Sequence, residues 1–302
     1  MMAPDAPPEG AGEQPRVAYL GPEGTFTEEA LLASARPDVV VPVAQTSIYE
    51  SVTALREGLV EWAIVPIENS LDGSVTVTLD LLAEGEADVA IVGEVQLLVR
   101  HSLIAGAGLA LEQIDTVLTH PQVPGQCRRF LREELPHARV LAAASTAEAV
   151  RTVVAPGHDR EAAIGTLLAA QIYGGTVLRE GVQDREDNET RFVWLGRVGS
   201  DGREPPLADG TGGGFKTSLV FWGRGAGSPG WLVRCLDEFA RRDINLTRIE
   251  SRPRRERLGS YMFFADLLGR ADETPVAAAI AGMRSMCEEV RVLGSYPVAA
   301  GS

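Results

Sequence analysis

The stretch VAYLGPEGTFTEEALLAS, residues 17–34, decides the fold class of this chain. It starts with a short apolar run that predicts a strand, continues with the polar loop at 21–25 and ends in a helical pattern. The same succession of strand, polar loop and helix recurs up to about Gly196, which predicts an α/β architecture with largely parallel sheets. Ligands bind such sheets beyond the carboxyl ends of the strands, so the loops there are the candidate site.

The expected elements follow from the spacing of apolar residues. Strands are predicted at 17–20, 39–43, 63–67, 89–99, 116–118, 140–142 and 162–164, and helices at 25–34, 47–57, 75–83, 124–134, 146–153 and 167–173. A stretch rich in Gly, Asp and Pro then interrupts every pattern, and a smaller β-α-β-β-α-β pattern follows it, typical of a ferredoxin-like module. We therefore predict a tail at 1–15, a main domain at 16–197, a linker at 198–215 and a second domain at 216–297.

Composition excludes several classes of function. The 302 residues carry a net charge of −14, which disfavours nucleic acid as a partner. The single lysine, Lys216, leaves no good candidate for Schiff-base chemistry, and the four scattered histidines follow no metal-binding spacing, so we expect neither cofactor nor metal. Cys127, Cys235 and Cys287 form no disulfide set, and no apolar run is long enough to span a membrane, so we expect a cytoplasmic protein.

Thr190 and Arg191 stand side by side just before an apolar run, and together they suit a small anionic substrate. A threonine hydroxyl can donate a proton to a leaving oxygen, and a guanidinium can grip a carboxylate with two hydrogen bonds. Taken alone, the pair is more often an ordinary solvated strand edge. Polar clusters after other predicted strands, at 21–25, 68–73, 119–122 and 145–146, could share a cleft with it, although each can also be a helix cap or turn.

These residues resemble a known family, the prephenate dehydratases with a C-terminal ACT-type regulatory domain. The segments that carry the resemblance are 19–25 (YLGPEGT), 66–70 (PIENS) with Gly73, 120–122 (HPQ) with Gln126 and Cys127, 145–147 (STA), 188–192 (NETRF) and, in the second domain, 244–253 (INLTRIESRP). The ordered set is specific and covers nearly the whole chain. The resemblance implies a two-lobed, periplasmic-binding-protein-like catalytic domain followed by a ferredoxin-like ACT domain.

The family reaction converts prephenate into phenylpyruvate, water and carbon dioxide and requires no cofactor. By resemblance, Thr190 protonates or polarises the departing hydroxyl, Arg191 orients a carboxylate and Phe192 packs against the pocket wall. The remaining catalytic candidates are Glu68, Asn69, Thr119 and Gln126, and the substrate-binding candidates are Thr25, Ser70, Gly73, His120, Ser145 and Thr146. Position 119 is usually serine in the family, and threonine keeps the hydroxyl while it stiffens the rotamer.

The resemblance also implies L-phenylalanine as an allosteric effector and a homodimer or homotetramer. The effector-binding candidates are Gly230, Trp231, Leu232, Asn245, Leu246, Glu250, Ser251, Arg252 and Pro253. Trp231 stands where the family usually has alanine. An inward tryptophan could fill the pocket and an outward one could widen the contact between subunits, so control by phenylalanine is left open.

Three other functions remain open at this point. A non-aromatising prephenate decarboxylase would not need Thr190. Arogenate, in which an amino group replaces the keto group, is a rival substrate that the sequence does not separate from prephenate. A non-catalytic amino-acid sensor with the same two-lobed fold would need neither Thr190 nor the other cleft residues.

Overall fold

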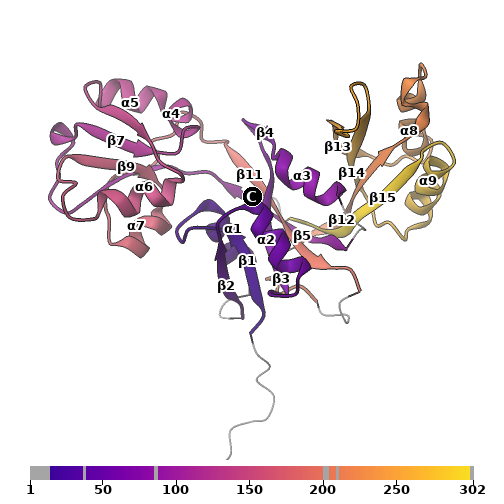
Figure 1. Cartoon of the computed structure of the whole chain (residues 1–302), viewed down its shortest axis with the longest axis horizontal. Helices are drawn as coiled ribbons and strands as arrows, with labels where there is room; N and C mark the ends of the chain where they lie inside the picture. Colours follow the sequence, from indigo (N-terminus) through magenta and orange to yellow (C-terminus); the bar gives the residue numbers. More distant parts are fainter. Residues whose placement is uncertain (1–13, 37–38, 85–87, 200–203, 209–210, 300–302) are drawn as a thin grey trace, which may run out of the picture.

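The computed structural model describes residues 14–36, 39–84, 88–199, 204–208 and 211–299. Apart from Gln14 and Pro15, the predicted tail lies outside the described residues. Three sheets organise the chain. Figure 1 shows them side by side, with the second lobe in magenta at one end, the first lobe in the middle and the C-terminal domain in orange and yellow at the other.

The first lobe contains a sheet in the order β2-β1-β3-β11-β5, and the short β4 pairs with β3. Its strands are β1 (Arg16–Leu20), β2 (Val41–Gln45), β3 (Trp62–Asn69), β4 (Gly73–Ser74), β5 (Val89–Leu98) and β11 (Glu189–Arg197), and its helices are α1 (Phe26–Ser34), α2 (Ile48–Arg56) and α3 (Thr76–Ala83). Thr25 and Ser47 begin α1 and α2 by accepting a backbone N–H with their side chains.

The second lobe contains a sheet in the order β10-β6-β9-β7-β8. Its strands are β6 (Ser102–Ala105), β7 (Thr116–Thr119), β8 (Arg139–Ala142), β9 (Glu161–Gly165) and β10 (Thr176–Arg179). Its helices are α4 (Val123–Gln126), α5 (Arg128–Glu134), α6 (Thr146–Val153) and α7 (Leu167–Tyr173), with a 3-10 turn at Leu111–Gln113. The chain enters this lobe after β5 and leaves it before β11, so two crossovers join the lobes, and the predicted two-lobed architecture is confirmed.

The expectation of largely parallel sheets is wrong. In the first lobe β2, β1 and β3 are parallel, but β11 runs antiparallel to both β3 and β5. In the second lobe β6 is antiparallel to β9 and β10. In the first lobe the reason is topological. β11 carries the chain back from the second lobe, so it enters the sheet in the direction opposite to β3 and β5.

The C-terminal domain has the predicted β-α-β-β-α-β order. Its elements are β12 (Thr211–Trp222), α8 (Trp231–Ala240), β13 (Leu246–Pro253), β14 (Tyr261–Leu268), α9 (Thr274–Arg284) and β15 (Glu289–Ala299), with a 3-10 turn at Arg224–Gly227. The strands form an antiparallel sheet in the order β13-β14-β12-β15. β12 begins inside the stretch predicted to be a linker, and Leu207 within that stretch packs against the first lobe.

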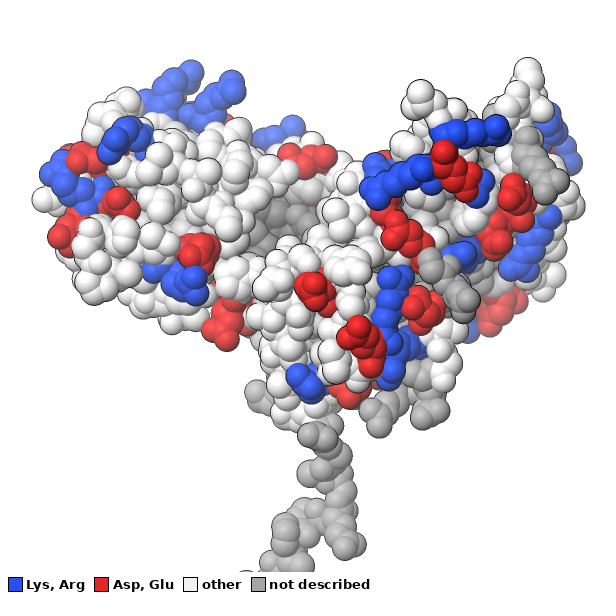
Figure 2. Space-filling view, viewed as in Figure 1, with Lys and Arg blue, Asp and Glu red and all other residues white. Residues whose placement is uncertain are grey.

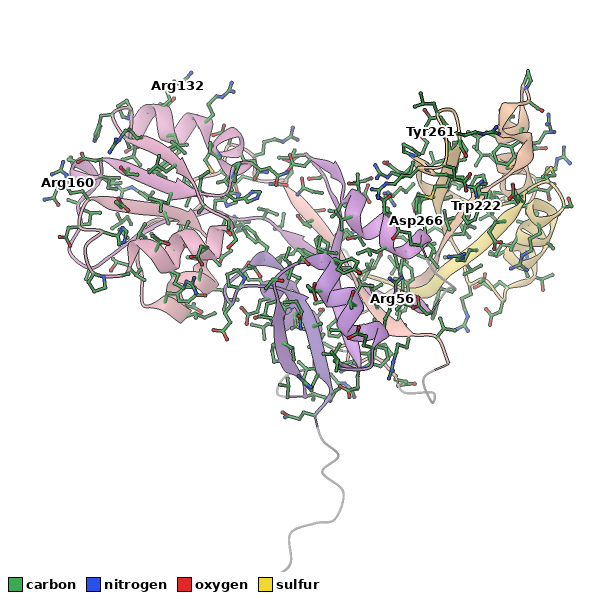
Figure 3. The ribbon with its side chains drawn as sticks, viewed as in Figure 1. Arg56, Arg132, Arg160, Trp222, Tyr261 and Asp266 are labelled. Carbon is green, nitrogen blue, oxygen red and sulfur yellow. The ribbon has the colours of Figure 1, made fainter. Side chains whose placement is uncertain are left out.

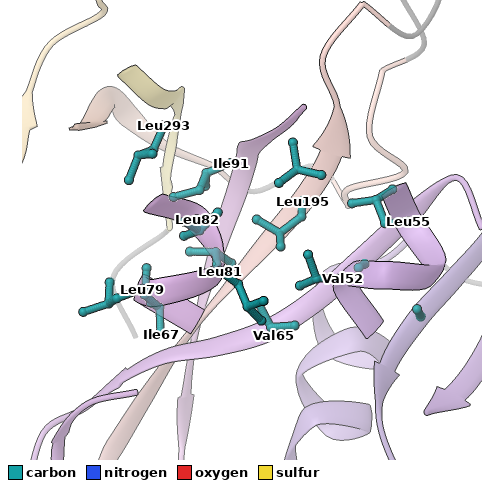
Figure 4. Close-up of a cluster of buried hydrophobic side chains, with 14 of the residues drawn as sticks. Val52, Leu55, Val65, Ile67, Leu79, Leu81, Leu82, Ile91, Leu195 and Leu293 are labelled. Atoms are coloured by element: carbon teal, nitrogen blue, oxygen red, sulfur yellow. The ribbon is translucent and has the colours of Figure 1, made fainter. Parts of the chain in front are cut away.

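One hydrophobic core joins the C-terminal domain to the first lobe. It combines Leu79 and Ile91 of the first lobe with Phe264 and Leu293 of the C-terminal domain, as Figure 4 shows for Ile91 and Leu293. A Cβ atom at Gly294 would collide with the carbonyl oxygen of Ile91, so the two backbones lie in direct contact. No helix in the described residues is long and apolar enough to cross a membrane.

Candidate functional site

A cavity of about 920 Å³ opens between the two lobes. Its walls are formed by loops at the ends of strands and by the first turns of helices. Figure 2 shows the hollow between the lobes, and the surface around it is mostly uncharged. The first lobe contributes Thr25, Asn69, Gly73, Thr190 and Phe192, and the second lobe and the crossovers contribute His101, His120, Gln126, Ser145, Thr146 and Arg151.

Asn69 and Thr190 form the centre of the site. They are register partners on β3 and β11, and Asn69 Nδ2 donates to Thr190 Oγ1 over 2.9 Å. The orientation of the Asn69 amide is fixed, because its Oδ1 accepts the backbone N–H groups of Leu71 and Asp72, both at 2.9 Å. Thr190 therefore acts as an acceptor toward Asn69, and among the described residues no acceptor binds the Thr190 proton.

A chain of amide groups extends from Asn69 across the cleft. Asn69 Nδ2 also donates to Asn188 Oδ1 at 2.9 Å, and Asn188 Nδ2 donates to Gln126 Oε1 at 3.2 Å. Gln126 Nε2 in turn donates to Asp72 at 3.2 Å. Each bond fixes the orientation of the next amide, so the direction of the whole network follows from the backbone donors that hold Asn69.

His101 is the last member of this network, and no motif in the sequence indicates it. Its Nε2 lies 2.9 Å from Gln126 Oε1, which already accepts from Asn188, so His101 Nε2 carries the proton and donates. The ring is 1 % exposed, and burial lowers the pKa of His101, although the hydrogen bond with Gln126 opposes the shift. His101 is therefore a neutral donor that holds Gln126 in place.

The cavity is suited to an anion mainly through helix N-termini. The first turns of α1, α3 and α6 line it, and Thr46 at the approach to α2 lines it as well. Backbone N–H groups at a helix N-terminus have no partner within the helix and carry a partial positive charge. Among the described lining residues Arg151 alone carries a permanent positive charge, and it is paired with Glu148 at 2.6 Å.

The structure brings together most of the residues expected from the sequence. Thr190, Phe192, Asn69, Gln126, Thr25, Gly73, His120, Ser145 and Thr146 all line the cavity. Ser145 caps α6 by accepting the Glu148 N–H, and Thr25 caps α1. Glu68, Ser70, Thr119 and Arg191 are not among the lining residues.

Two of these four have local structural contacts instead. Thr119 is 1 % exposed, and its hydroxyl donates to the carbonyl of Ile164, so it ties β7 to β9. Ser70 Oγ accepts the Glu189 N–H at 3.0 Å and closes the loop after β3. Neither hydroxyl points into the cavity, so the predicted roles of Thr119 and Ser70 in catalysis and binding need revision.

The predicted role of Arg191 as a carboxylate clamp also needs correction. Its guanidinium lies on the opposite face of β11 from Thr190, and Nη2 donates to Asp266 of the C-terminal domain over 2.7 Å. Figure 3 labels Asp266 on the side of its domain that faces the first lobe. The physical reason is that consecutive side chains of a strand point to opposite faces. Glu68 is the register partner of Arg191 on β3. Register partners on neighbouring strands point to the same side of a sheet, so Glu68 also lies on the face away from Thr190.

The effector-binding candidates divide between two faces of β13. Glu250 and Arg252 point toward the first lobe, where they bond to Ser74 and Asp80, whereas Ser251 and Pro253 are exposed on the other face. Gly230 precedes α8 with a φ of 75°, Leu232 packs against the domain core, and Asn245 is exposed just before Leu246, which begins β13.

Trp231 points inward. It is 4 % exposed, its Nε1 donates to the Met286 carbonyl over 3.0 Å, and its ring lies against Phe221 and Phe263. The indole thus belongs to the hydrophobic core of the C-terminal domain, which settles its orientation between the two possibilities that the sequence left open.

Comparisons with known proteins give matches over most of this chain. A family model described as prephenate dehydratase matches residues 17–200. The prephenate dehydratase of Mycolicibacterium vanbaalenii is 42% identical over 296 residues, which cover 94% of this chain and 91% of that protein.

Two solved structures are similar over nearly the full length. The prephenate dehydratase of Arthrobacter aurescens, in complex with L-Phe, superposes with a TM-score of 0.81 at 34% identity, covering 95% of this chain and 93% of the other. GqqA, described as a novel type of quorum quenching acylase, superposes with a TM-score of 0.79 at 29% identity, covering 94% and 98%.

Proposed function

The chain belongs to the prephenate dehydratase family, and from this premise we propose how its residues carry out the reaction. The enzyme is a carbon–oxygen lyase that forms phenylpyruvate for phenylalanine biosynthesis. Prephenate loses its ring hydroxyl and its ring carboxylate. The electron pair of the breaking bond to the carboxylate moves into the ring, which becomes aromatic as the C–O bond breaks.

The hydrogen bond from Asn69 to Thr190 is the observation that supports the proposed mechanism. Because Thr190 Oγ1 accepts from Asn69, its own proton is available to the departing ring oxygen. The same bond stabilises the negative charge that develops on Oγ1 during proton transfer, which compensates for the low intrinsic acidity of a threonine hydroxyl. Thr190 then recovers a proton from the solvent, so the prephenate dianion and one proton give the phenylpyruvate monoanion, carbon dioxide and water.

We assign recognition of the dianion to the helix N-termini that line the cavity rather than to Arg191. The N-termini of α1 and α3 come from the first lobe and that of α6 from the second, so a substrate with two carboxylates can bind to both lobes. Phe26 and Phe192 supply apolar surface for the ring. Prephenate is the proposed substrate in preference to arogenate, because the two carboxylates that line the cavity among the described residues already have partners. Asp72 accepts a hydrogen bond from Gln126, and Glu148 is paired with Arg151.

The acylase activity named for one similar structure requires a nucleophile activated by a base. Among the described residues that line the cavity, no hydroxyl is hydrogen-bonded to a histidine. The lyase reaction is therefore the one we propose for this cavity.

The C-terminal domain is proposed to bind L-phenylalanine, and the similar Arthrobacter aurescens structure is in complex with L-Phe. The exposed face of β13, with Ile249 and Ser251, is the proposed side for the effector and for a second copy of the chain, and the assembly would be a homodimer or homotetramer. A cytoplasmic location belongs to the same proposal, in keeping with a metabolic enzyme.

The test of this function is an absorbance assay for phenylpyruvate after incubation of the purified protein with prephenate. It is run in parallel with an assay for L-phenylalanine after incubation with arogenate, because the amino group of arogenate is retained in its product. We expect rapid product formation from prephenate and at least tenfold slower formation from arogenate. A protein that binds prephenate without forming phenylpyruvate would instead be a sensor. Titration of L-phenylalanine, followed by turnover and by melting temperature, tests the regulatory proposal.

A further inference from the structure

The catalytic pair lies in a ladder of three short strand segments. β11 pairs with β3 and β3 pairs with β4, so Thr190, Asn69 and Gly73 form one row across the ladder. The next row consists of Arg191, Glu68 and Ser74. We call this second row the rear row, because Arg191 and Glu68 point away from the cavity and toward the C-terminal domain.

The C-terminal domain contacts each member of the rear row. Asp266 on β14 accepts from Arg191 at 2.7 Å. Arg248 on β13 donates to Ser74 Oγ at 2.7 Å, and Ser74 Oγ donates to Glu250 on β13 at 3.0 Å. The strand that carries the effector-binding candidates is thus bonded to β4, which is one row away from Asn69.

Arg191 is held by buried charges on two sides. Its Nη1 lies 3.6 Å from Glu94, and Glu94 in turn binds Lys216 at 2.7 Å. Burial works against the charge of Arg191, but the nearby carboxylates outweigh it and raise its pKa, with Asp266 as the strongest of them. Asp266 shows the converse, since burial favours its neutral form while Arg191 and the Ser218 hydroxyl hold its pKa below the ordinary value. Removal of Asp266 would leave the buried Arg191 charge with Glu94 as its nearest carboxylate, at 3.6 Å.

Glu68 occupies an intermediate position in the rear row. Its Oε2 lies 3.7 Å from Arg191 Nε and 3.6 Å from Arg248 Nε, so it attracts both guanidinium groups but is at hydrogen-bond distance from neither. Arg191 Nε is buried and has no hydrogen-bond partner among the described residues. A shift of less than about 1 Å would bring Glu68 to hydrogen-bond distance from either arginine.

We propose that the rear row positions the catalytic pair and couples it to the regulatory domain. Arg191, Glu68 and Ser74 are positioning residues: they hold the strands that carry Thr190 and Asn69 against β13 and β14. A ligand on the exposed face of β13 changes the position of Arg248 and Glu250, and the rear row passes that change to Thr190. The inference rests on the proposed enzymatic function and names the residues through which that function is regulated.

The first experiment compares Arg248→Gln with Arg255→Gln. Arg248 contacts two members of the rear row, whereas Arg255, beyond the end of β13, bonds to Asp80 and to no member of the row. L-Phenylalanine binding is measured by calorimetry and its effect on kcat in the phenylpyruvate assay. We expect the dissociation constant of Arg248→Gln for phenylalanine to stay within about threefold of the parent value. The variant should lose about tenfold or more of the effect that saturating phenylalanine has on kcat. Arg255→Gln should retain it.

Equal coupling in Arg248→Gln and the parent would overturn the inference, provided the parent forms phenylpyruvate. A parent that forms none would instead refute the proposed function. These two failures are therefore distinguishable in the same experiment.

The second experiment needs no effector. Asp266→Asn keeps the shape of the side chain but removes the charge that holds Arg191. If the row positions Thr190, kcat should fall about tenfold or more while KM stays within about threefold, since Thr190 acts in the transition state. A lower melting temperature with unchanged kcat in the folded enzyme would reduce Asp266 to a structural role and contradict the proposal.

Discussion

Asn188, in the crossover that returns to the first lobe, donates from Nδ2 to Oε1 of Gln126 on the second lobe over 3.2 Å. This bond connects a residue next to the catalytic strand with a residue of the opposite lobe. His101 and Asp72 bond to the same glutamine, so Gln126 receives two hydrogen bonds and gives one. The arrangement makes Gln126 the point at which both lobes and both crossovers meet.

Gln126→Leu should therefore disturb catalysis beyond the loss of one contact. The buried Nδ2 of Asn188 and Nε2 of His101 would lose their acceptor, which weakens the network beside Asn69 and Thr190. We expect kcat to fall about tenfold to a hundredfold. Steady-state kinetics with prephenate provides the measurement, and Gln122→Leu, in the same cavity but outside the network, should keep kcat within about threefold of the parent.

Thr190→Val tests the proton donor directly. Valine has nearly the shape of threonine but no hydroxyl, so we expect kcat to fall on the order of a hundredfold or more. Thr190→Ser keeps the hydroxyl and should retain kcat within about tenfold, the loss arising from the freer rotamer. Near-normal turnover of the valine variant would remove Thr190 from the chemical step.

Asn69→Asp tests the direction of the hydrogen bond to Thr190. The substitution replaces the donor Nδ2 by an oxygen, so Thr190 would donate its proton to the new carboxylate and no longer to the substrate. The contacts of Oδ1 with Leu71 and Asp72 would survive, so the loop should keep its shape. We expect kcat to fall about a hundredfold near pH 7 and to recover partly as pH falls and the new carboxyl group is protonated. A pH–rate profile that parallels that of the parent would contradict this mechanism.

A residue's place at the cavity could be predicted from the sequence where it depends on a strand end or a helix cap. Asn69, Thr190, Ser145 and Thr25 belong to this group, because local chemistry places each of them at the edge of a sheet or at the start of a helix. The strands β6 and β10 were not predicted, since each is only a few residues long and lacks a clear alternation.

Arg191 and His101 show what local patterns miss. Alternation along a strand already places neighbours 190 and 191 on opposite faces, but only the structure shows that a second domain covers the rear face. His101 stands between β5 and β6, and its role depends on Gln126, which is 25 positions away in the chain. No spacing rule connects two such residues, because their contact is created by the crossover between the lobes.

Trp231→Ala tests whether the indole belongs to the core. Its contacts with Phe221 and Phe263 and its bond to Met286 would be lost, and the cavity that remains should cost about 3–5 kcal/mol of stability. We expect a clear drop in the melting temperature. Val233 on the same helix is 69% exposed, so Val233→Ala should change stability by no more than about 0.5 kcal/mol.

Glu29→Gln should stabilise the enzyme in alkaline solution. Burial raises the pKa of Glu29 to about 7, the Glu28 carboxylate adds to the shift, and a hydrogen bond from the Leu168 backbone opposes it. The folded protein thus holds this proton more tightly than the unfolded chain, in which glutamate titrates near pH ~4.3. Its contribution to stability is complete below that value and is lost as pH rises through about 7.

Glutamine resembles the protonated carboxyl group at every pH. We therefore expect Glu29→Gln to exceed the parent by about 2 kcal/mol at pH 8 and to match it near pH 4, because only the charged form of Glu29 is penalised by burial. Melting temperatures of both proteins between pH 4 and 8 measure the difference. Glu50→Gln, at an exposed position in the first turn of α2, serves as the control and should show no gain that grows with pH. A gain of equal size at pH 4 and pH 8 would show that packing, not the carboxylate charge, governs stability at position 29.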